Sequence, residues 1–172
     1  MVFYARMTVI FGKHGQLASS FRATRMGRSA TYLSSADVCF TKSSQIVAAL
    51  DRLKPKVIVN AAAYTQVDKA EDEKEICTQI NADSVGVIAD WAAANEATLV
   101  HFSTDYVFAG NGDNPWTEAC PAKPVNWYGE SKLLGEQKIT ASGCHSVIFR
   151  TSWIFSEHGK NFVKTMLHLG KS

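Results

Sequence analysis

The sequence has no apolar run of about 20 residues, which is the length that a membrane-spanning helix needs. The apolar run in the first twelve residues, MVFYARMTVIFG, is short and is interrupted by Arg6, so we expect no signal peptide. The net charge is only +2, which gives no general reason to expect binding to nucleic acid or to an anionic membrane. These features point away from membrane and nucleic-acid partners.

The chain also has no clustered cysteines or histidines. Its four cysteines are widely scattered, without a CxxC pattern that would indicate zinc or a disulfide framework: Cys39, Cys77, Cys120 and Cys144. No histidine has metal-ligand spacing, so no metal ligand is assigned. A reduced, cytoplasmic protein fits this cysteine usage best.

At 172 residues the chain is long enough to bury a full hydrophobic core but short for two large domains. Residues 7–172 are therefore interpreted as one domain. Met7 precedes the first clear strand, and residues 1–6 are interpreted as a short extension or a misassigned start.

Short apolar runs alternate with longer helical patterns along this sequence. The expected strands are 8–11, 30–33, 56–60, 98–103 and 146–150, with a short extended piece or loop at 37–40. The expected helices are 16–26, 46–53, 83–95, one starting near Tyr128 and one starting near Asn161. This alternation predicts an α/β fold with a doubly wound parallel sheet, whose ligands bind beyond the carboxyl ends of the strands.

The glycine turn after the first strand has the spacing Gly12-x-x-Gly15-x-x-Ala18, in FGKHGQLA. Glycines here allow a tight turn and close approach of a pyrophosphate to the start of the next helix. Glycines also end strands for structural reasons alone, and the spacing is not GxGxxG, so the motif by itself leaves both interpretations open. No acidic residue lies at 31–35 to bind an adenosine ribose, whereas Arg25 or Arg28 could meet a 2′-phosphate, which slightly favours NADP over NAD.

Tyr128 precedes Lys132 by four residues in NWYGESK, so the two side chains share one face of the predicted helix. A neighbouring ammonium favours the phenolate, and we expect it to lower the pKa of Tyr128 from near 10 toward the working range. Such a phenol can protonate a carbonyl oxygen as hydride arrives. YxxxK is common by chance, but Thr104 after one strand and the alanines of NAAAY after another are expected at the same sheet edge.

Two charged groups have more than one interpretation. The acidic side chains of residues 68–75 are interpreted as a solvated helix face rather than a site for a divalent ion. The basic run that precedes Asp37 is either a solvated face or an edge that meets phosphate: Arg6, Lys13, Arg22, Arg25 and Arg28.

Several segments together resemble the extended short-chain dehydrogenase/reductases, and within them the dTDP-4-dehydrorhamnose reductases. The matching segments are FGKHGQLA, KPKVIVNAAAYTQVDKAE, INADSV, HFSTDYVFAGNGDNPWTE, PVNWYGESKLLGE, FRTSWIF and NFVKTML. The resemblance implies an NAD(P)-binding Rossmann fold and reduction of the 4-keto group of dTDP-4-dehydro-L-rhamnose by NADPH or NADH. The product would be dTDP-L-rhamnose, a precursor of bacterial surface polysaccharides. The expected partner is thus a dTDP-sugar, and a homodimer is left open.

The resemblance also implies roles for individual residues. Tyr128 would be the proton donor, Lys132 its pKa partner and a ribose ligand, and Thr104 would bind the carbonyl. Cofactor contacts are expected from the glycine turn, the second strand end and the third strand end: Gly12, Gly15, Gln16, Leu17, Cys39, Phe40, Ala61, Ala62 and Ala63. Asp105 and Trp153 match positions near the sugar nucleotide.

The sequence departs from the family pattern in three places. Cys39 and Cys120 stand where family members tend to carry aspartate, which we expect to weaken cofactor binding at the first position. The chain also ends at HLGKS, inside an expected helix, so we expect a truncated chain that lacks most of the substrate side.

Two other functions remain open on the same fold. A non-catalytic regulatory subunit, like the beta subunit of methionine adenosyltransferase, could retain the Thr104, Tyr128 and Lys132 set. Another sugar-nucleotide reductase or epimerase would share the cofactor half and differ in its substrate part.

Overall fold

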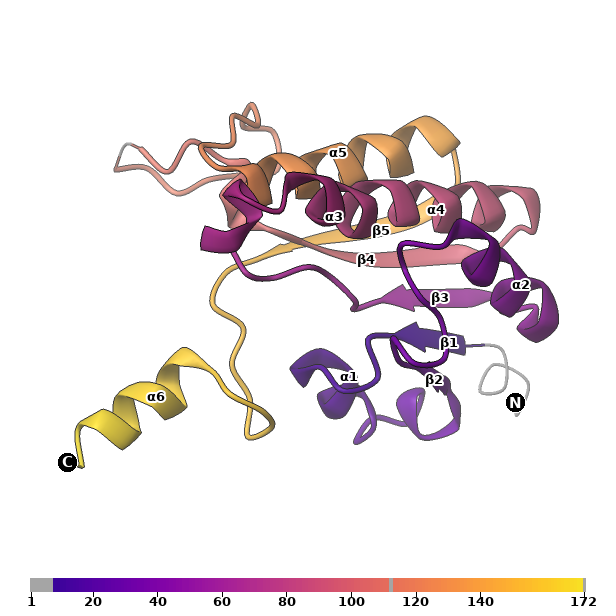
Figure 1. Ribbon diagram of the computed structural model, residues 1–172, viewed down its shortest axis with the longest axis horizontal. Coiled ribbons are helices and arrows are strands. Elements are labelled where there is room, and N and C mark those ends of the chain that lie inside the picture. Colours follow the sequence, from indigo (N-terminus) through magenta and orange to yellow (C-terminus); the bar gives the residue numbers. More distant parts are fainter. Residues whose placement is uncertain (1–7, 112, 172) are drawn as a thin grey trace.

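The computed structural model describes residues 8–111 and 113–171, and the segment interpreted as an extension lies outside the described residues. Its centre is a five-stranded parallel sheet in the order β2-β1-β3-β4-β5 (Figure 1). The strands are β1 (Thr8–Phe11), β2 (Thr31–Leu33), β3 (Val57–Asn60), β4 (Thr98–Thr104) and β5 (His145–Thr151). All five lie where the sequence predicts them to within two residues, and the parallel sheet confirms the doubly wound α/β fold class.

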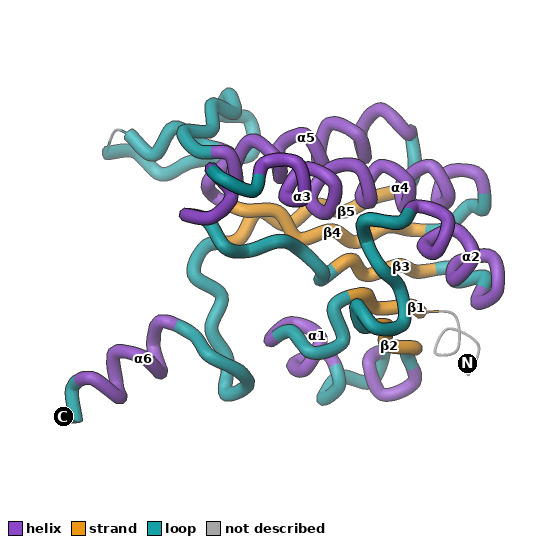
Figure 2. The backbone as a smooth tube through the Cα atoms, viewed as in Figure 1, coloured by secondary structure: helices purple, strands orange, loops and turns teal. Residues whose placement is uncertain are grey.

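The helices are α1 (Gln16–Phe21), α2 (Ser43–Leu53), α3 (Lys74–Thr78), α4 (Ser84–Ala94), α5 (Trp127–Ser142) and α6 (Phe162–Leu169). Short 3₁₀ turns are η2 (Gly27–Ser29), η3 (Asp68–Glu71) and η5 (Asp105–Val107), and η4 (Gln79–Asp83) is a π-helical turn. Figure 2 shows helices α2 to α5 on one face of the sheet and α1 on the other. None of the helices in the described residues is long and apolar enough to cross a membrane.

The two faces of the sheet are covered by two separate apolar clusters. Val9 and Phe11 of β1 pack with α2, α4 and α5, whereas Ile10 between them packs with Ala18 of α1. Successive strand residues point to opposite faces, so a strand buried on both sides must be apolar throughout. This is why the short runs in the sequence are continuous rather than alternating.

Helix α1 is shorter than the 16–26 helix that the sequence predicts. It ends at Phe21, where the hydroxyl of Thr24 donates a hydrogen bond to the Phe21 carbonyl and accepts one from the Gly27 N–H. A threonine that bonds the backbone in this way competes with the helical pattern. The helix predicted at 83–95 begins earlier than expected, because α3, η4 and α4 form one helical run from Lys74 to Ala94.

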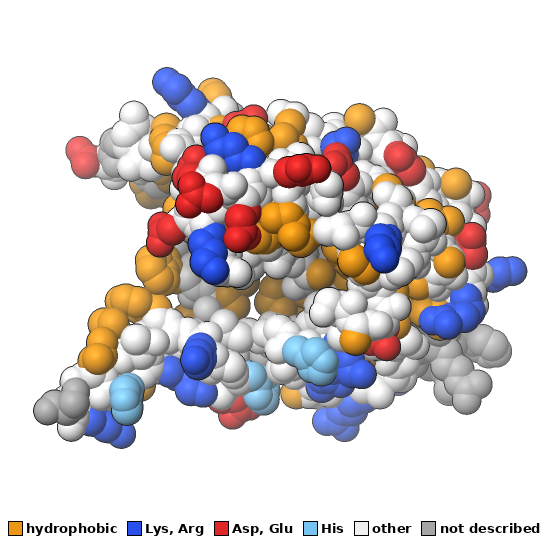
Figure 3. Space-filling model, in the orientation of Figure 1, with side chains coloured by type: hydrophobic (Ala, Val, Ile, Leu, Met, Phe, Trp, Pro, Cys, Tyr) orange, Lys and Arg blue, Asp and Glu red, His pale blue; other side chains and the backbone are white. Residues whose placement is uncertain are grey.

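Helix α6 lies apart from the sheet at the end of an extended segment and has no buried residue (Figures 1 and 2). Its side chains Phe162 and Leu167 are exposed, as is Phe149 of β5. Figure 3 shows a hollow between the segment that carries α6 and the rest of the molecule. Asn161 caps the helix by accepting a hydrogen bond from the Lys164 N–H, so its start agrees with the sequence.

Candidate active site

The chain leaves the neighbouring strands β1 and β3 toward opposite faces of the sheet, which opens a crevice at their carboxyl ends. Gly12 follows β1 with a φ of 91°, a left-handed conformation that favours glycine. An added Cβ at Gly12 would lie 2.6 Å from the carbonyl oxygen of Ala61, which follows β3. The glycine therefore lets two strand ends approach closely at the place where the fold family binds ligands.

A cavity of about 340 Å³ opens at this edge. Nine of the residues predicted for the site line it: Leu17, Ala61, Ala62, Ala63, Thr104, Asp105, Tyr128, Lys132 and Trp153. They come from the ends of three strands, β3, β4 and β5, and from α1 and α5, so tertiary structure gathers side chains that are up to 136 residues apart in the sequence (from 17 to 153). Residues that the sequence reasoning did not assign also line it, among them Ser103, Thr151 and Ile154.

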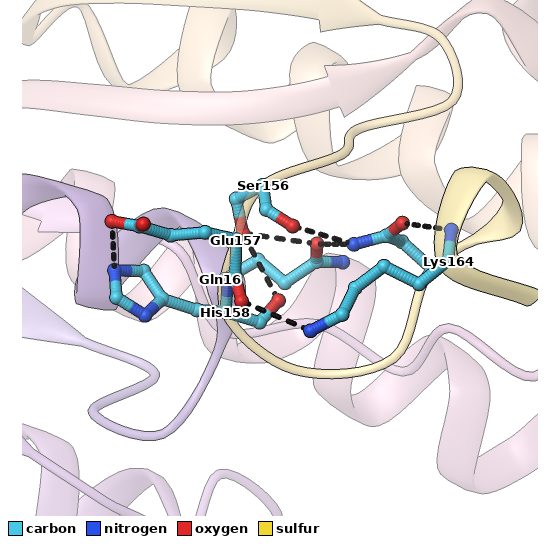
Figure 4. Close-up of polar contacts among 6 residues, drawn as sticks. Gln16, Ser156, Glu157, His158 and Lys164 are labelled. Carbon is cyan, nitrogen blue, oxygen red and sulfur yellow. Dashed lines mark hydrogen bonds and ion pairs between the residues drawn. The ribbon is translucent and has the colours of Figure 1, made fainter. Parts of the chain in front are cut away.

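Gln16 begins α1 but does not line the cavity. Its side-chain oxygen accepts hydrogen bonds from Ser156 Oγ at 3.2 Å and from Asn161 Nδ2 at 3.0 Å. Figure 4 shows these contacts, which tie the first helix to the segment after β5. The Gln16 side chain, expected to face a pyrophosphate, is thus hydrogen-bonded to a loop. Gly12 and Gly15 form the turn, in which the Gly15 N–H donates a 2.8 Å hydrogen bond to the Gly12 carbonyl.

Tyr128 lies in the first turn of α5, with its ring edge-on to Tyr106 at a centroid distance of 5.8 Å. Burial raises the pKa of Tyr128 above its ordinary value of 10, the Thr104 hydroxyl opposes that effect, and the Asp105 carboxylate adds to it. The sequence-based prediction that Lys132 lowers the pKa of Tyr128 is therefore wrong for this structure. Thr104 accepts a hydrogen bond from the Tyr106 N–H and donates one to Asp105, so its hydroxyl is fixed at the end of β4.

The ammonium group of Lys132 is engaged elsewhere, which explains this difference. Lys132 Nζ donates a 2.6 Å hydrogen bond to the Phe102 carbonyl and lies 3.2 Å from His101 Nε2. The side chain is 1% exposed, and burial lowers the pKa of Lys132 to about 8, against a smaller opposing effect of Glu136. Sequence spacing correctly placed Lys132 beside Tyr128 on α5, but it could not show that strand β4 takes the charged end.

Asn81 is a buried residue of this region that the sequence reasoning missed. Its Oδ1 accepts from the Tyr64 N–H, and its Nδ2 donates to the Tyr64 carbonyl and to Ser131 Oγ. The π-helical turn η4 places it there, and its own carbonyl oxygen would be 2.3 Å from a Cβ at Gly135 of α5. Asn81 thereby ties the loop after β3 to the helix that carries Tyr128. The segment INADSV contained the asparagine, but no periodicity marks a π-helical turn.

Ser103 provides an independent indication that this cavity binds a polar ligand. Its Oγ is buried and has no hydrogen-bond partner among the described residues, yet the residue lines the cavity. Buried polar atoms are normally paired, so an unpaired hydroxyl at a cavity wall suits a ligand group. With the close backbone approach at Gly12 and the small alanines after β3, the residues present fit a flat dinucleotide.

Comparison with known proteins agrees with this geometry. Residues 6–172 match the family model described as RmlD substrate binding domain. The chain is 44% identical over 170 residues to a dTDP-4-dehydrorhamnose reductase of Escherichia coli strain K12, covering 95% of this chain and 56% of that relative. The chain belongs to this family.

Solved structures in the family superpose closely on this member. The dTDP-4-dehydrorhamnose reductase of Bacillus anthracis, solved in complex with NADP, has a TM-score of 0.90 at 35% identity, covering 95% of this chain and 59% of that one. The Clostridium acetobutylicum protein of the same name has a TM-score of 0.89 with the same identity and coverage. This RmlD family chain thus spans little more than half the length of the relatives it matches.

The two cysteines for which the sequence analysis expected an aspartate in relatives each lie beside a threonine. Cys39 Sγ lies 3.1 Å from Thr41 Oγ1, and Cys120 Sγ accepts from the Thr117 N–H at 3.4 Å. In each case the threonine hydrogen bond lowers the pKa of the thiol. Neither cysteine lines the cavity, and Phe40, the other residue predicted beside the cofactor, packs edge-on against Phe11 at 5.2 Å.

The basic and acidic groups are placed by specific contacts. The Arg22 guanidinium donates to the Lys13 carbonyl at 2.9 Å and lies over the Tyr32 ring, so Arg22 reaches back to the glycine turn. Arg28 instead bonds the Ala23 carbonyl on the turn that precedes β2. Arg22 therefore lies at the glycine turn, whereas Arg28, one of the two arginines that the sequence favoured, is held on the turn before β2.

Acidic side chains gather over η3 and α3 (Figure 3), but several of them have protein partners. Glu73 accepts a 2.6 Å hydrogen bond from the Tyr64 hydroxyl, which raises the pKa of Tyr64 to about 12. Across the described ranges, no group of three or more His, Cys, Asp or Glu side chains is placed to hold a metal ion. All five acidic residues of this segment are exposed, as the solvated-face interpretation predicts: Asp68, Glu71, Asp72, Glu73 and Glu75.

Proposed function

We propose that this chain is the cofactor-binding portion of an NAD(P)H-dependent reductase that converts dTDP-4-dehydro-L-rhamnose to dTDP-L-rhamnose. The observation that carries the proposal is the single cavity lined by Thr104, Tyr128 and Lys132 together with the alanines after β3. Membership of the RmlD family, whose named relatives are dTDP-4-dehydrorhamnose reductases, supports the choice of reaction. We further propose that residues 7–172 form one NAD(P)-binding Rossmann domain.

The proposed cofactor site runs along the carboxyl edge of β1 and β3. Gly12, Gly15 and the main chain at Gln16 and Leu17 would hold the pyrophosphate, and Ala61, Ala62 and Ala63 would leave room for flat rings. The region after β2, with Cys39 and Phe40, would border the adenine. When bound, NADPH or NADH supplies the hydride. NADPH is slightly favoured, because 31–35 has no acid and the Arg22 and Lys13 pair adds positive charge near the turn.

The proposed chemistry of the protein itself is a proton transfer. The Tyr128 hydroxyl would donate its proton to the C4 oxygen of the keto sugar as negative charge grows there. The Thr104 hydroxyl would turn its proton from Asp105 to donate a hydrogen bond to the same oxygen. A phenol with a pKa above 10 is protonated at neutral pH, so Tyr128 begins the reaction as an acid. Asp105 and Trp153 border the cavity on the side proposed for the sugar nucleotide.

Calorimetric titration of the chain with NADPH, NADH and dTDP-sugar tests this proposal. A reductase portion binds a reduced dinucleotide, and retained sugar contacts would also give weak binding of the dTDP-sugar. A non-catalytic regulatory subunit on the same fold need not bind the sugar. Absence of binding of either dinucleotide would overturn the proposed function.

Assembly and location are also proposals. The four cysteines are free, which suits the reducing cytoplasm proposed for the protein. A dTDP-sugar is the proposed small-molecule partner, and no nucleic acid or membrane partner is proposed. Light scattering of the purified chain distinguishes a homodimer, which remains open, from a monomer.

A further inference from the structure

Three buried polar side chains form a chain beneath the cavity. Asn60 ends β3, His101 lies in the middle of β4, and Lys132 projects from α5, with exposed fractions of 1%, 0% and 1%. Asn60 Nδ2 lies 3.2 Å from His101 Nδ1, and His101 Nε2 lies 3.2 Å from Lys132 Nζ. The reaction proposed above gives no role to Asn60 or His101.

The direction of each hydrogen bond in this chain is fixed by its starting point. The Ala62 backbone N–H donates to Asn60 Oδ1 at 3.2 Å, and a backbone N–H can only donate. The amide of Asn60 must therefore present its NH₂ group to His101. Because that group is also only a donor, His101 Nδ1 must be the unprotonated acceptor.

The polarity then passes through the imidazole. His101 is fully buried, and burial together with the nearby Lys132 holds the pKa of His101 well below its ordinary value, so the ring is neutral. A neutral imidazole with an unprotonated Nδ1 carries its proton on Nε2. The Nε2–H group points at Lys132 Nζ, which can accept it only as an uncharged amine with a free lone pair.

We propose that Asn60 and His101 are positioning residues that deliver a hydrogen-bond donor to Lys132, and thereby couple the protonation of Lys132 to the tautomer of His101. With Lys132 as an amine, the Nε2–H tautomer satisfies every bond from Ala62 to the Phe102 carbonyl. With Lys132 as an ammonium, the imidazole must carry its proton on Nδ1 or face donor against donor. One bond of the chain is lost in that state.

The other charged or titratable groups near Lys132 do not reverse this polarity. Glu136 lies one turn further along α5 and Cys77 lies on α3, and both raise the pKa of Lys132 by charge. Asn60 and His101 are both buried, so this series of hydrogen bonds ends inside the protein rather than at solvent. The pair therefore biases Lys132 rather than conducting protons to it.

This coupling is a property of the fold without cofactor or substrate. Its consequence for Tyr128 rests on the proposed function, because an uncharged Lys132 would leave the phenol without a neighbouring cation. The coupling makes that neighbouring charge adjustable, since a ligand that favours the ammonium would also move the proton of His101. A failed reductase assay would leave the coupling itself untouched.

Nitrogen-15 NMR of the imidazole in the unmodified chain is the direct test. At about pH 9, above the Lys132 pKa of about 8, we expect His101 to resonate with a protonated Nε2 and an unprotonated Nδ1. As the pH falls through the Lys132 midpoint, signal should move toward the Nδ1–H form. A protonated Nδ1 at high pH would overturn the proposal.

The Asn60→Asp variant reverses the polarity, because a carboxylate accepts from both the Ala62 N–H and His101 Nδ1. We expect its His101 to carry the proton on Nδ1 and its Lys132 midpoint to rise by about one unit, a ten-fold gain in proton affinity. Glu136→Gln is the matched control: it removes a charge that acts on Lys132, so it should lower the midpoint while His101 keeps the Nε2–H form at about pH 9. An Asn60→Asp protein that keeps the Nε2–H form contradicts the inference, and if that variant does not fold, the tautomer of the unmodified chain decides.

Discussion

The carboxylate of Glu71 accepts a 2.7 Å hydrogen bond from the backbone N–H of Trp127, 56 residues away in the sequence. This N–H belongs to the first residue of α5 and has no partner within the helix. The indole of Trp127 also donates to the Lys74 carbonyl and to Thr78. Residues 71–78 therefore hold the start of α5 through both the backbone and the side chain of Trp127. The next residue of the helix is Tyr128, so this contact helps to fix the proposed acid.

Removing this grip should destabilise the protein. We expect Glu71→Ala to lower the free energy of unfolding by about 1 kcal/mol, because a charged acceptor at a helix N-terminus is lost. Glu75→Ala is the control from the same segment, since Glu75 bonds only the exposed Gln79 amide, at 3.3 Å. Urea unfolding should show a change of less than about 0.5 kcal/mol for the control, and equal losses in both variants would refute the capping role.

Loss of the Tyr128 hydroxyl should remove the proposed acid with little effect on packing. In a full-length protein with the proposed reductase activity, Tyr128→Phe should lower kcat by about 100-fold or more, while KM and stability stay nearly unchanged. Tyr106→Phe is the same chemical change in the ring that packs edge-on against Tyr128. Steady-state kinetics should show Tyr106→Phe close to the parent rate, and an undiminished rate in Tyr128→Phe would eliminate this residue as the acid.

The close approach at the glycine turn gives a test of the cofactor crevice. Gly12→Ala should cost about 2–4 kcal/mol of stability and abolish dinucleotide binding, because it combines a left-handed conformation with a Cβ 2.6 Å from the Ala61 oxygen. Gly143→Ala is the matched control: its φ is also positive, at 68°, but nothing lies within 4 Å of the added Cβ. It should cost about 1 kcal/mol and leave binding intact. Calorimetry with NADPH and urea unfolding would check both, and similar losses in the two variants would argue against the crevice.

The buried Lys132 makes stability depend on pH with a defined sign. Its pKa is about 8 in the folded protein and near 10.5 when unfolded, so the unfolded state binds more protons between these values. Burying the charge costs at most about 3 kcal/mol of stability. This cost is full below about pH 8 and disappears as the pH rises toward about 10.5. Relative to Lys132→Met, the unfolding free energy of the parent should rise over this window. Urea unfolding at each pH gives the free energy of unfolding of both proteins. If the two free energies changed equally with pH, the lowered pKa of Lys132 would be contradicted.

The sequence predicted the strands better than the helices. A strand buried on both faces is mainly apolar, and the apolar runs at β1 and β3 therefore predicted these strands. Helix ends depend on whether side chains or the helix itself take the backbone hydrogen bonds. The sequence therefore missed the Thr24 hydroxyl that ends α1 at Phe21, and it missed the π-helical turn that extends the helix before Ser84. The alternation of strands and helices along the sequence was enough to predict a site at the carboxyl ends of the strands.

The identities of the site residues were less predictable than their location. Tyr128 and Lys132 share a helix face, and the four-residue spacing is enough to place them together. The partners of Lys132 come from a different element, and nothing in TLVHFS marks which side of the strand His101 faces or what it meets. The same is true of Gln16, whose contacts with Ser156 and Asn161 join segments 140 and 145 residues apart.

The sequence alone determined a wound parallel sheet with a glycine turn at its edge and a tyrosine and lysine on one helix face, because these depend on periodicity and local backbone geometry. Only the tertiary structure decided where the Lys132 side chain points and that the Ser103 hydroxyl stays unpaired. It also decided that the pKa of Tyr128 is raised by burial instead of lowered by Lys132. Hydrogen bonding and desolvation depend on which atoms from distant segments meet and on how completely water is excluded, and these are settled when the strands and helices pack together.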